Sequence, residues 1–286
     1  MKLTIGLAQI SPRLGDAKAN LDKHLRFIEQ VATQGVELLV FPELSLTGYM
    51  LQDLVHDVAI VTARTPAPDD PLLAPLLDAS HNLDLVVGFA ERDVRGRLFT
   101  AGAYLAQGRI VHVHRKVYLP TYGMFDEGRD FDCGEEVRAF DTRFGRAGLL
   151  ICEDFWHASP PYLLWLDGAD LMLLTSASPG RGIDHRDKLG SSRFVELVNQ
   201  AYANLFGCFV VHVNRVGFED GVNFWGGSTV FGPDGELIVQ APYFEESLLV
   251  TTLDWSALRR ARARLPLLRD ERPELTQREL ERILNK

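Results

Sequence analysis

Short apolar runs, separated by stretches of helical periodicity, constrain the fold of this chain more than any other feature of its sequence. Six runs have the length and composition of buried β-strands: LTIGLAQI (3–10), ELLVFPE (37–43), LDLVVGFAE (83–91), RAGLLIC (146–152), ADLMLLTS (169–176) and CFVVHVNRV (208–216). Two intervening stretches repeat apolar residues at helical spacing. The first contains Leu21, Leu25, Ile28 and Val31 and stops at Gly35, and the second contains Phe194, Leu197, Val198, Ala201 and Leu205 and stops at Gly207. This alternation predicts an α/β protein.

Two β-hairpins stand apart from this alternation. Residues 98–116 turn at Gln107-Gly108, and residues 228–240 turn at Pro233-Asp234-Gly235. Hairpins within a β-α chain predict helices that cover sheets with antiparallel members, and they argue against a purely parallel barrel. We expect one domain over residues 1–255. Residues 256–286 are expected to form a helical tail that packs on the domain or on a partner subunit.

Charge and cysteine usage exclude several classes of function. The 286 residues carry a formal net charge of −9 without a basic block, which argues against nucleic-acid binding. No apolar run approaches the roughly 18 to 20 residues of a membrane span, and MKLTIGLAQISP is too short and polar for a signal peptide. The cysteines Cys133, Cys152 and Cys208 lack CxxC spacing. We therefore expect a cytoplasmic protein whose partners are neither nucleic acids nor membranes.

Chemically reactive side chains stand where three predicted strands end. Glu43 lies in FPELSLTGY, Lys116 in VHVHRKVYLPTYGMFDEG and Cys152 in AGLLICEDFWH. Taken singly, each has an ordinary explanation: a solvated loop acid, a charge that blunts a sheet edge and a small core residue. Glu127, in FDEG, by itself fits a turn. Strand ends converge at one edge of layered α/β folds, so together these residues predict a common site.

A thiol, a carboxylate and an ammonium in one site can act together as a nucleophile, a base and a stabilising positive charge. A thiol with a pKa of about 8.5 needs a base or a positive neighbour to act as a nucleophile at neutral pH. Glu43 can take the proton of Cys152 and return it to a leaving amine, while Lys116 and the backbone N–H of Glu153 hold the oxyanion. The combination predicts acyl transfer through a thioester.

The motifs FPELSLTGY, HRKVYLPTYGMFDEGRDF and GLLICEDFW resemble, in order and spacing, the signature stretches of the nitrilase (carbon–nitrogen hydrolase) superfamily. The resemblance runs from about residue 3 to residue 255. It implies a Glu43–Lys116–Cys152 triad, with Glu127 as an additional acid. It also implies a four-layer α-β-β-α sandwich of two mixed β-sheets and a homodimer or higher homo-oligomer.

Within that superfamily, HRKVYLPTYGMFDE, ICEDFW and TSASP are most similar to the glutamine-amidase domain of glutamine-dependent NAD synthetases. This resemblance implies that the substrate is held by Tyr122, Glu153, Trp156 and one of the two serines Ser176 and Ser178. The sequence lacks the SGGxDS loop of the synthetase's ATP-using domain, so we expect a chain that is not a fused synthetase. The segment GRGIDHRDK (180–188) matches no family motif, and its role stays open.

Other signals are weaker. His112 and His114 alternate on a strand and share a face, but no third ligand follows, so a polar hairpin face is favoured over a metal site. No P-loop or GxGxxG pattern is present, and we expect no cofactor.

The sequence thus predicts a thiol amidase acting on a small linear amide, such as an ω-amide or an N-carbamoyl amine. Two alternatives remain: a glutaminase subunit that supplies ammonia to a separate synthetase, and a non-catalytic small-molecule-binding protein on the same fold.

Overall fold

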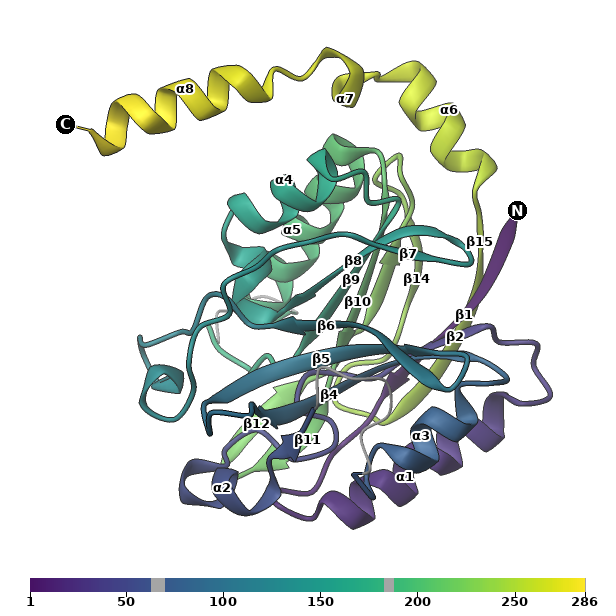
Figure 1. The fold of residues 1–286 in the computed structure, drawn as a ribbon. Coiled ribbons are helices and arrows are strands. Elements are labelled where there is room, and N and C mark those ends of the chain that lie inside the picture. The colour runs from purple at the N-terminus through teal and green to yellow at the C-terminus, as the bar shows by residue number, and fades with distance from the viewer. Residues whose placement is uncertain (63–69, 183–187, 286) are drawn as a thin grey trace.

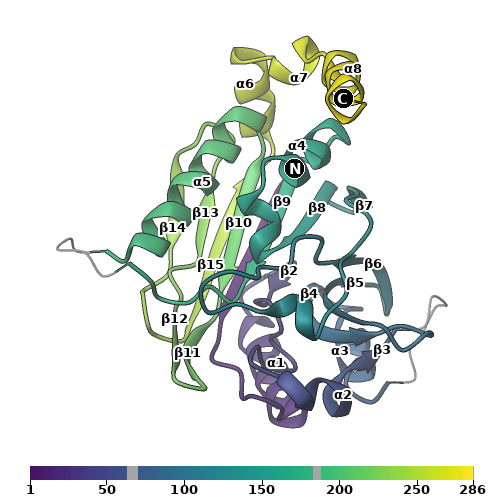
Figure 2. The same cartoon turned by 90° about the vertical axis from the view of Figure 1, so that its left-hand side faces the viewer.

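Two mixed β-sheets lie face to face, and helices cover the outer side of each (Figure 1, Figure 2). The structure is a computed structural model of the chain and describes residues 1–62, 70–182 and 188–285. Most of the segment 180–188, whose role the sequence leaves open, therefore lies outside the described residues.

In the described residues the first sheet has the strand order β15-β1-β2-β4-β5-β6, with β3 paired to β4. Strands β1, β2 and β4 are parallel, and β5 and β6 form the predicted hairpin, so β6 runs in the same direction as β2. The strands are β1 (Lys2–Gln9), β2 (Leu38–Val40), β3 (Ile60–Val61), β4 (Asp84–Arg92), β5 (Leu98–Ala106), β6 (Arg109–Arg115) and β15 (Ser247–Asp254). The carboxyl ends of β2 and β6 thus lie at one edge.

In the described residues the second sheet has the order β14-β13-β10-β9-β8-β7, with β8, β9 and β10 parallel. Strands β11 and β12 form a separate ribbon. The strands are β7 (Phe140–Thr142), β8 (Gly145–Ile151), β9 (Leu171–Ser176), β10 (Phe209–Asn214), β11 (Val216–Glu219), β12 (Val222–Trp225), β13 (Thr229–Phe231) and β14 (Leu237–Gln240). The second predicted hairpin is β13–β14, and it is confirmed.

The helices complete the four layers. Helices α1 (Ala17–Val31) and α3 (Ala74–Ala79) cover the first sheet, and α4 (Ser159–Leu166) and α5 (Gly190–Phe206) cover the second (Figure 1). The remaining helical elements are η1 (Gln52–Leu54), α2 (Val55–Val58), η2 (Glu127–Arg129), η3 (Cys152–Trp156), α6 (Ser256–Arg264), α7 (Leu267–Asp270) and α8 (Pro273–Leu284). No helix in the described ranges is long and apolar enough to span a bilayer.

Apolar side chains fill each of the three spaces between layers. Between the sheets, inward-facing residues of β1 and β2 meet those of β8, β9 and β10; this cluster includes Ile5, Val40, Leu149, Leu173 and Val211. A second cluster joins the first sheet to α1 and α3, and a third joins the second sheet to α4 and α5. The predicted α-β-β-α sandwich of two mixed sheets is confirmed.

Two predicted elements differ in detail from the observed ones. The strand expected over residues 37–43 is limited to β2, because Pro42 has no N–H to extend the ladder beyond Phe41. The second predicted helical stripe belongs to α5, but the helix buries Ser192, Val195, Asn199 and Ala203 instead. Of the stripe, Phe194, Leu197 and Leu205 are exposed, Leu197 by 63%. Periodicity identifies an apolar face of a helix, but it does not show whether that face packs on the sheet or lies at the surface.

The C-terminal helices run across one end of the molecule, beyond α4 (Figure 1, Figure 2). Helix α6 is anchored, because Leu258 is buried in the core between the sheets and Arg262 Nη1 lies 2.7 Å from Asp170 Oδ1. Helix α8 buries none of its residues. Its apolar side chains, Leu275, Leu280, Ile283 and Leu284, are all exposed.

Strand β4 passes so close to the segment after β2 that only glycine fits at position 88. A Cβ atom on Gly88 would lie 2.5 Å from the carbonyl oxygen of Pro42 and 2.6 Å from the backbone nitrogen of Leu44. Both neighbours are backbone atoms and cannot rotate away. We expect Gly88→Ala to lower the free energy of unfolding by about 1–3 kcal/mol, the range for overpacked cores.

Urea denaturation measures this loss, and Gly128→Ala is the matched control. A Cβ on Gly128 would meet its nearest atom, Thr121 Cγ2, at an ordinary 3.5 Å. We expect the control to change stability by less than about 0.5 kcal/mol. Equal stability of the two variants would contradict the close approach at Gly88.

Candidate active site

Three strand ends from two sheets meet at one edge of the sandwich. Lys116 directly follows β6 and Cys152 directly follows β8, while Glu43 lies three residues beyond β2. Strands β2 and β6 belong to the first sheet and β8 to the second. The structure therefore brings the predicted residues together by joining ends of parallel-running strands across the two sheets.

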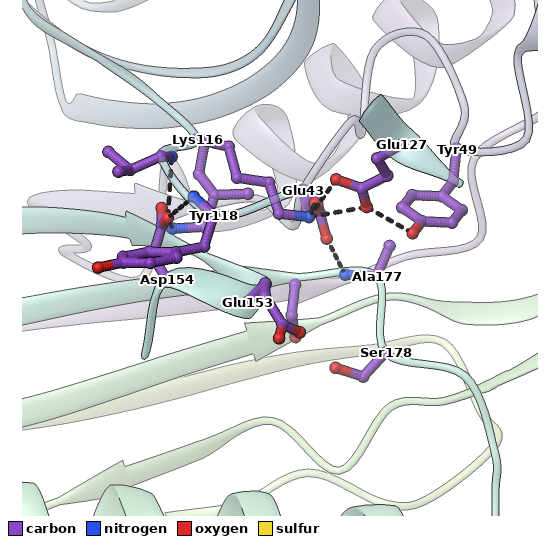
Figure 3. A network of polar contacts seen from close by, with 12 residues as sticks. Glu43, Tyr49, Lys116, Tyr118, Glu127, Glu153, Asp154, Ala177 and Ser178 are labelled. Atoms are coloured by element: carbon purple, nitrogen blue, oxygen red, sulfur yellow. Dashed lines mark hydrogen bonds and ion pairs between the residues drawn. The ribbon is translucent and has the colours of Figure 1, made fainter. Parts of the chain in front are cut away.

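A buried ammonium is the centre of this arrangement. Lys116 Nζ lies 2.9 Å from Glu43 Oε1 and 2.8 Å from the carboxylate of Glu127, and the Lys116 side chain is fully buried (Figure 3). Burial alone would lower the pKa of Lys116, but the charges of Glu127 and Glu43 raise this pKa well above its ordinary value. Lys116 is therefore held as a cation.

Each carboxylate is fixed by a second contact. Glu43 Oε2 accepts a hydrogen bond of 2.6 Å from the backbone N–H of Ala177, which follows β9. Glu127 Oε1 accepts a hydrogen bond of 2.6 Å from the hydroxyl of Tyr49. Burial, opposed by Lys116 and reinforced by Glu43, raises the pKa of Glu127. The second sheet thus holds Glu43, and the segment after Glu43 holds Glu127.

The Cys152 thiol is buried, with 6% of the residue exposed, and it lies within electrostatic reach of this network. Burial and the negative charge of Glu43 raise its pKa well above the ordinary value, although Lys116 acts in the opposite direction. Burial and Glu43 thus both favour the protonated form of the thiol. A nucleophilic role requires that a base remove this proton as the sulfur attacks.

Polar and aromatic side chains surround the outer part of the site. The hydroxyl of Tyr122 donates to Glu153 Oε2 at 2.9 Å, and Tyr122 is 45% exposed. The guanidinium carbon of Arg181 lies 5.7 Å from the ring centroid of Tyr122 and 4.9 Å from that of Phe125. A carboxylate and a guanidinium thus flank one tyrosine. Sequence analysis did not single out Arg181, because the segment 180–188 matches no motif.

The two candidate serines have different surroundings. Ser176 is fully buried, and its Oγ lies 2.7 Å from His212 Nε2 and 3.2 Å from Asn214 Oδ1. The Ser178 hydroxyl has no hydrogen-bond partner among the described residues and is 4% exposed. In Figure 3 the side chains of Ser178 and Glu153 lie on the same side of the ion-pair network. Ser178 has the hydroxyl available for a ligand.

The ring of Trp156 packs against α5. Its ring stacks on Phe194 with centroids 4.6 Å apart and an interplanar angle of 24°. The structure therefore places Trp156 in the wall between η3 and α5, not within hydrogen-bond reach of Lys116 or Glu43.

The two histidines of β6 do not form the polar hairpin face that the sequence favours. His114 is buried, and its Nε2 lies 2.8 Å from Asp154 Oδ2. His112 stacks on Phe140 at 4.4 Å, and burial lowers its pKa to about 4. This face of β6 is covered because it packs against the second sheet. Among the described residues, no group of three or more potential metal ligands was found.

Sequence analysis missed Tyr49 and Asp154. Tyr49 is part of FPELSLTGY, but its contact with Glu127 spans 78 positions of the chain. Asp154 is part of ICEDFW, and its four hydrogen-bond donors lie in two different segments. Both residues lie in motifs that the sequence analysis had identified. No spacing rule, however, predicts the hydrogen-bond partners of Tyr49 and Asp154 in distant parts of the chain.

Known proteins share this architecture. The chain is 34% identical over 260 residues to a glutamine-dependent NAD(+) synthetase of Thermotoga maritima, covering 88% of this chain and 42% of that protein. It spans less than half the length of the curated synthetases it matches. The structure of a carbon-nitrogen hydrolase from Helicobacter pylori superimposes with a TM-score of 0.82 at 21% identity, covering 98% of this chain and 99% of that one.

A mutant amidase from Nesterenkonia, carrying an acetamide moiety covalently added at its active-site cysteine, matches with a TM-score of 0.78 at 24% identity, over 96% of each chain. The family model described as carbon-nitrogen hydrolase matches residues 4–263, which span both sheets and all three of the strand ends described above. The chain belongs to the carbon–nitrogen hydrolase family.

Proposed function

We propose that this chain hydrolyses the carbon–nitrogen bond of a small linear amide through a thioester on Cys152. The observation that carries the proposal is the buried Cys152 thiol beside the buried Glu43–Lys116–Glu127 ion-pair network. Such a site contains a nucleophile, a base and a cation for the oxyanion, which is what acyl transfer requires. No role in it needs a metal or an organic cofactor.

The proposed reaction begins with proton transfer from Cys152 to Glu43 as Sγ attacks the amide carbon. Lys116 Nζ and the backbone N–H of Glu153 stabilise the oxyanion. When the C–N bond breaks, Glu43 returns the proton to the leaving nitrogen, and ammonia departs from a primary amide. Glu43 then deprotonates a water molecule that attacks the thioester. As the C–S bond breaks, Glu43 returns this proton to Sγ, and the carboxylic acid product leaves.

Glu127 is proposed to keep Lys116 in place during these steps. Its carboxylate lies 2.8 Å from Lys116 Nζ, and its other fixed contact is the Tyr49 hydroxyl. When Glu43 is neutralised by the thiol proton, Glu127 remains as the counter-charge of the ammonium. The Lys116 cation therefore stays in position for the oxyanion.

The outer part of the site favours an amide with charged groups at its far end. Glu153, whose carboxylate is bonded to Tyr122, suits an ammonium, and Arg181 suits a carboxylate. An ω-amide of an amino acid, such as glutamine, carries both. The proposed substrate contacts are Tyr122, Glu153, Ser178 and Arg181, with Trp156 and Ser176 shaping the wall; an N-carbamoyl amine that carries a carboxylate is the next candidate.

A second candidate function is a glutaminase that passes ammonia to a separate synthetase. The observation that favours it is the similarity of this chain to glutamine-dependent NAD(+) synthetases. Ammonia release from glutamine that rises only when a synthetase is added would support this candidate. Steady release by the chain alone would support the simple amidase.

We also propose that the chain forms a homodimer or higher homo-oligomer and that it resides in the cytoplasm. Exposed apolar residues of α5 (Phe194, Leu197 and Leu205) and of α8 are suited to contact a second copy. We expect Leu197→Glu to lower the particle mass in light scattering to that of one chain, because a charge would be buried at the interface. Unchanged mass, or a single-chain mass for the wild-type protein, would contradict an interface at this helix.

Cys152→Ala tests the proposed reaction. Ammonia release should be measured with L-glutamine, L-asparagine, butanamide, N-carbamoyl-β-alanine and a nitrile. We expect the wild-type chain to hydrolyse one class, and Cys152→Ala to lose at least about 1,000-fold in turnover, because no nucleophile remains. Cys133→Ala, at an exposed cysteine, is the matched control and should keep full activity. Ammonia release by folded Cys152→Ala would show that Cys152 is not the nucleophile.

Arg181→Gln tests the carboxylate contact. Glutaramate and pentanamide are two linear five-carbon amides that differ at the far end, where glutaramate has a carboxylate and pentanamide a methyl group. Loss of a charge-assisted hydrogen bond should lower kcat/KM for glutaramate by about 10- to 100-fold and leave pentanamide within about twofold. Arg138→Gln, at an exposed arginine paired with Glu136, is the control and should change neither substrate. Equal losses for both amides would argue against a carboxylate-binding role.

A further inference from the structure

Four N–H groups converge on the buried carboxylate of Asp154. Oδ1 accepts hydrogen bonds from the backbone N–H groups of Val117 and Tyr118, both at 2.9 Å. Oδ2 accepts one from the backbone N–H of Ile151 at 3.0 Å and lies 2.8 Å from Nε2 of His114. A carboxylate only accepts, so Nε2 of His114 carries the hydrogen. These contacts occupy the four acceptor positions of Asp154 and leave none for a substrate.

The donors belong to the two segments that carry the proposed chemistry. His114 lies two residues before Lys116, and Val117 and Tyr118 directly follow Lys116. Ile151 directly precedes Cys152. Because Lys116 follows a strand of the first sheet and Cys152 a strand of the second, the Asp154 carboxylate joins the two sheets at the site (Figure 3).

The backbone at Cys152 needs such support. Its φ angle is +46°, a left-handed conformation that costs energy in a residue with a Cβ atom. The hydrogen bond from Ile151 N–H to Asp154 closes the turn across Cys152. The same carboxylate therefore stabilises the turn that directs the thiol and fixes the chain on both sides of Lys116.

We propose that Asp154 is a positioning residue that sets the placement of Cys152 relative to Lys116, and that His114 secures Asp154 by its hydrogen bond. This inference rests on the proposed thiol chemistry. Neither residue touches the amide. Each acts by keeping the sulfur and the ammonium at the separation that attack and oxyanion stabilisation require.

A purely structural role predicts a different result, and Asp84 is the matched control. Its carboxylate is also buried, and it accepts from the Tyr104 hydroxyl at 2.7 Å and lies 3.2 Å from Arg143 Nε. Asp84 pairs with Leu38 at the amino end of β2, so it lies at the strand ends opposite to Glu43. Removing either carboxylate destabilises the fold, but only Asp154 should affect the chemistry.

The experiment measures alkylation of Cys152 by iodoacetamide, with the rate of Cys152→Ala subtracted, together with kcat and KM for L-glutamine. In Asp154→Asn an amide NH₂ replaces one acceptor and faces other N–H donors. We expect alkylation and kcat to fall on the order of 100-fold, the effect of a misplacement of about 1 Å, with KM within about threefold. Asp84→Asn should lower the melting temperature but keep the alkylation rate and kcat within about twofold.

A pair of His114 variants tests the same inference if Asp154→Asn does not fold. His114→Gln retains an N–H donor and should keep at least about a third of the wild-type alkylation rate, whereas His114→Leu has none and should lose about tenfold or more. Wild-type rates in folded Asp154→Asn or His114→Leu would overturn the inference. Equal losses in Asp84→Asn would also overturn it. If the wild-type thiol is alkylated but no amide is hydrolysed, the amidase proposal fails, and the alkylation rates still decide the role of Asp154.

Discussion

The rest of the site depends on the buried ion pairs that the Lys116 ammonium forms with Glu43 and Glu127. An unpaired ammonium in a protein interior costs several kcal/mol, so this cation is stable only with both carboxylates in contact. Those carboxylates are held in turn by Ala177 N–H, at the end of β9, and by the Tyr49 hydroxyl. The ion-pair network thus requires strand ends from both sheets, and the α-β-β-α packing is what brings those ends together.

The burial and the charge balance of this network favour the neutral form of the Cys152 thiol, the proposed nucleophile. Burial raises the pKa of the Cys152 thiol, and Glu43 and Glu127 raise it further, because two carboxylates surround the single ammonium that acts in the opposite direction. A free thiolate would be unstable there without a substrate. In the proposed reaction, proton transfer to Glu43 removes one negative charge when the sulfur attacks, and the remaining pair of Lys116 and Glu127 is then matched to an oxyanion. A site that works in this way is complementary to the reacting state rather than to the resting one.

Much of this could be predicted from the sequence, because strand ends obey simple geometry. Glu43, Lys116 and Cys152 each lie at or near the end of a predicted strand, and ends of parallel-running strands share an edge. What could not be predicted depends on contacts between distant segments. Nothing in TSASP shows that Ser176 points to His212 while the described residues leave Ser178 unpaired, and periodicity alone did not show that the apolar stripe of α5 faces outward.

The structure also separates the residues proposed to carry the chemistry from those proposed to select the substrate. The ion pairs, the turn at Cys152 and the Asp154 contacts rest on strand ends and backbone hydrogen bonds, which tolerate little change. Tyr122 and Arg181 lie in irregular segments outside the sheets, where a substitution need not disturb the core. Substrate preference in this fold can therefore change by altering the outer segments alone, because the position of the thiol does not depend on them.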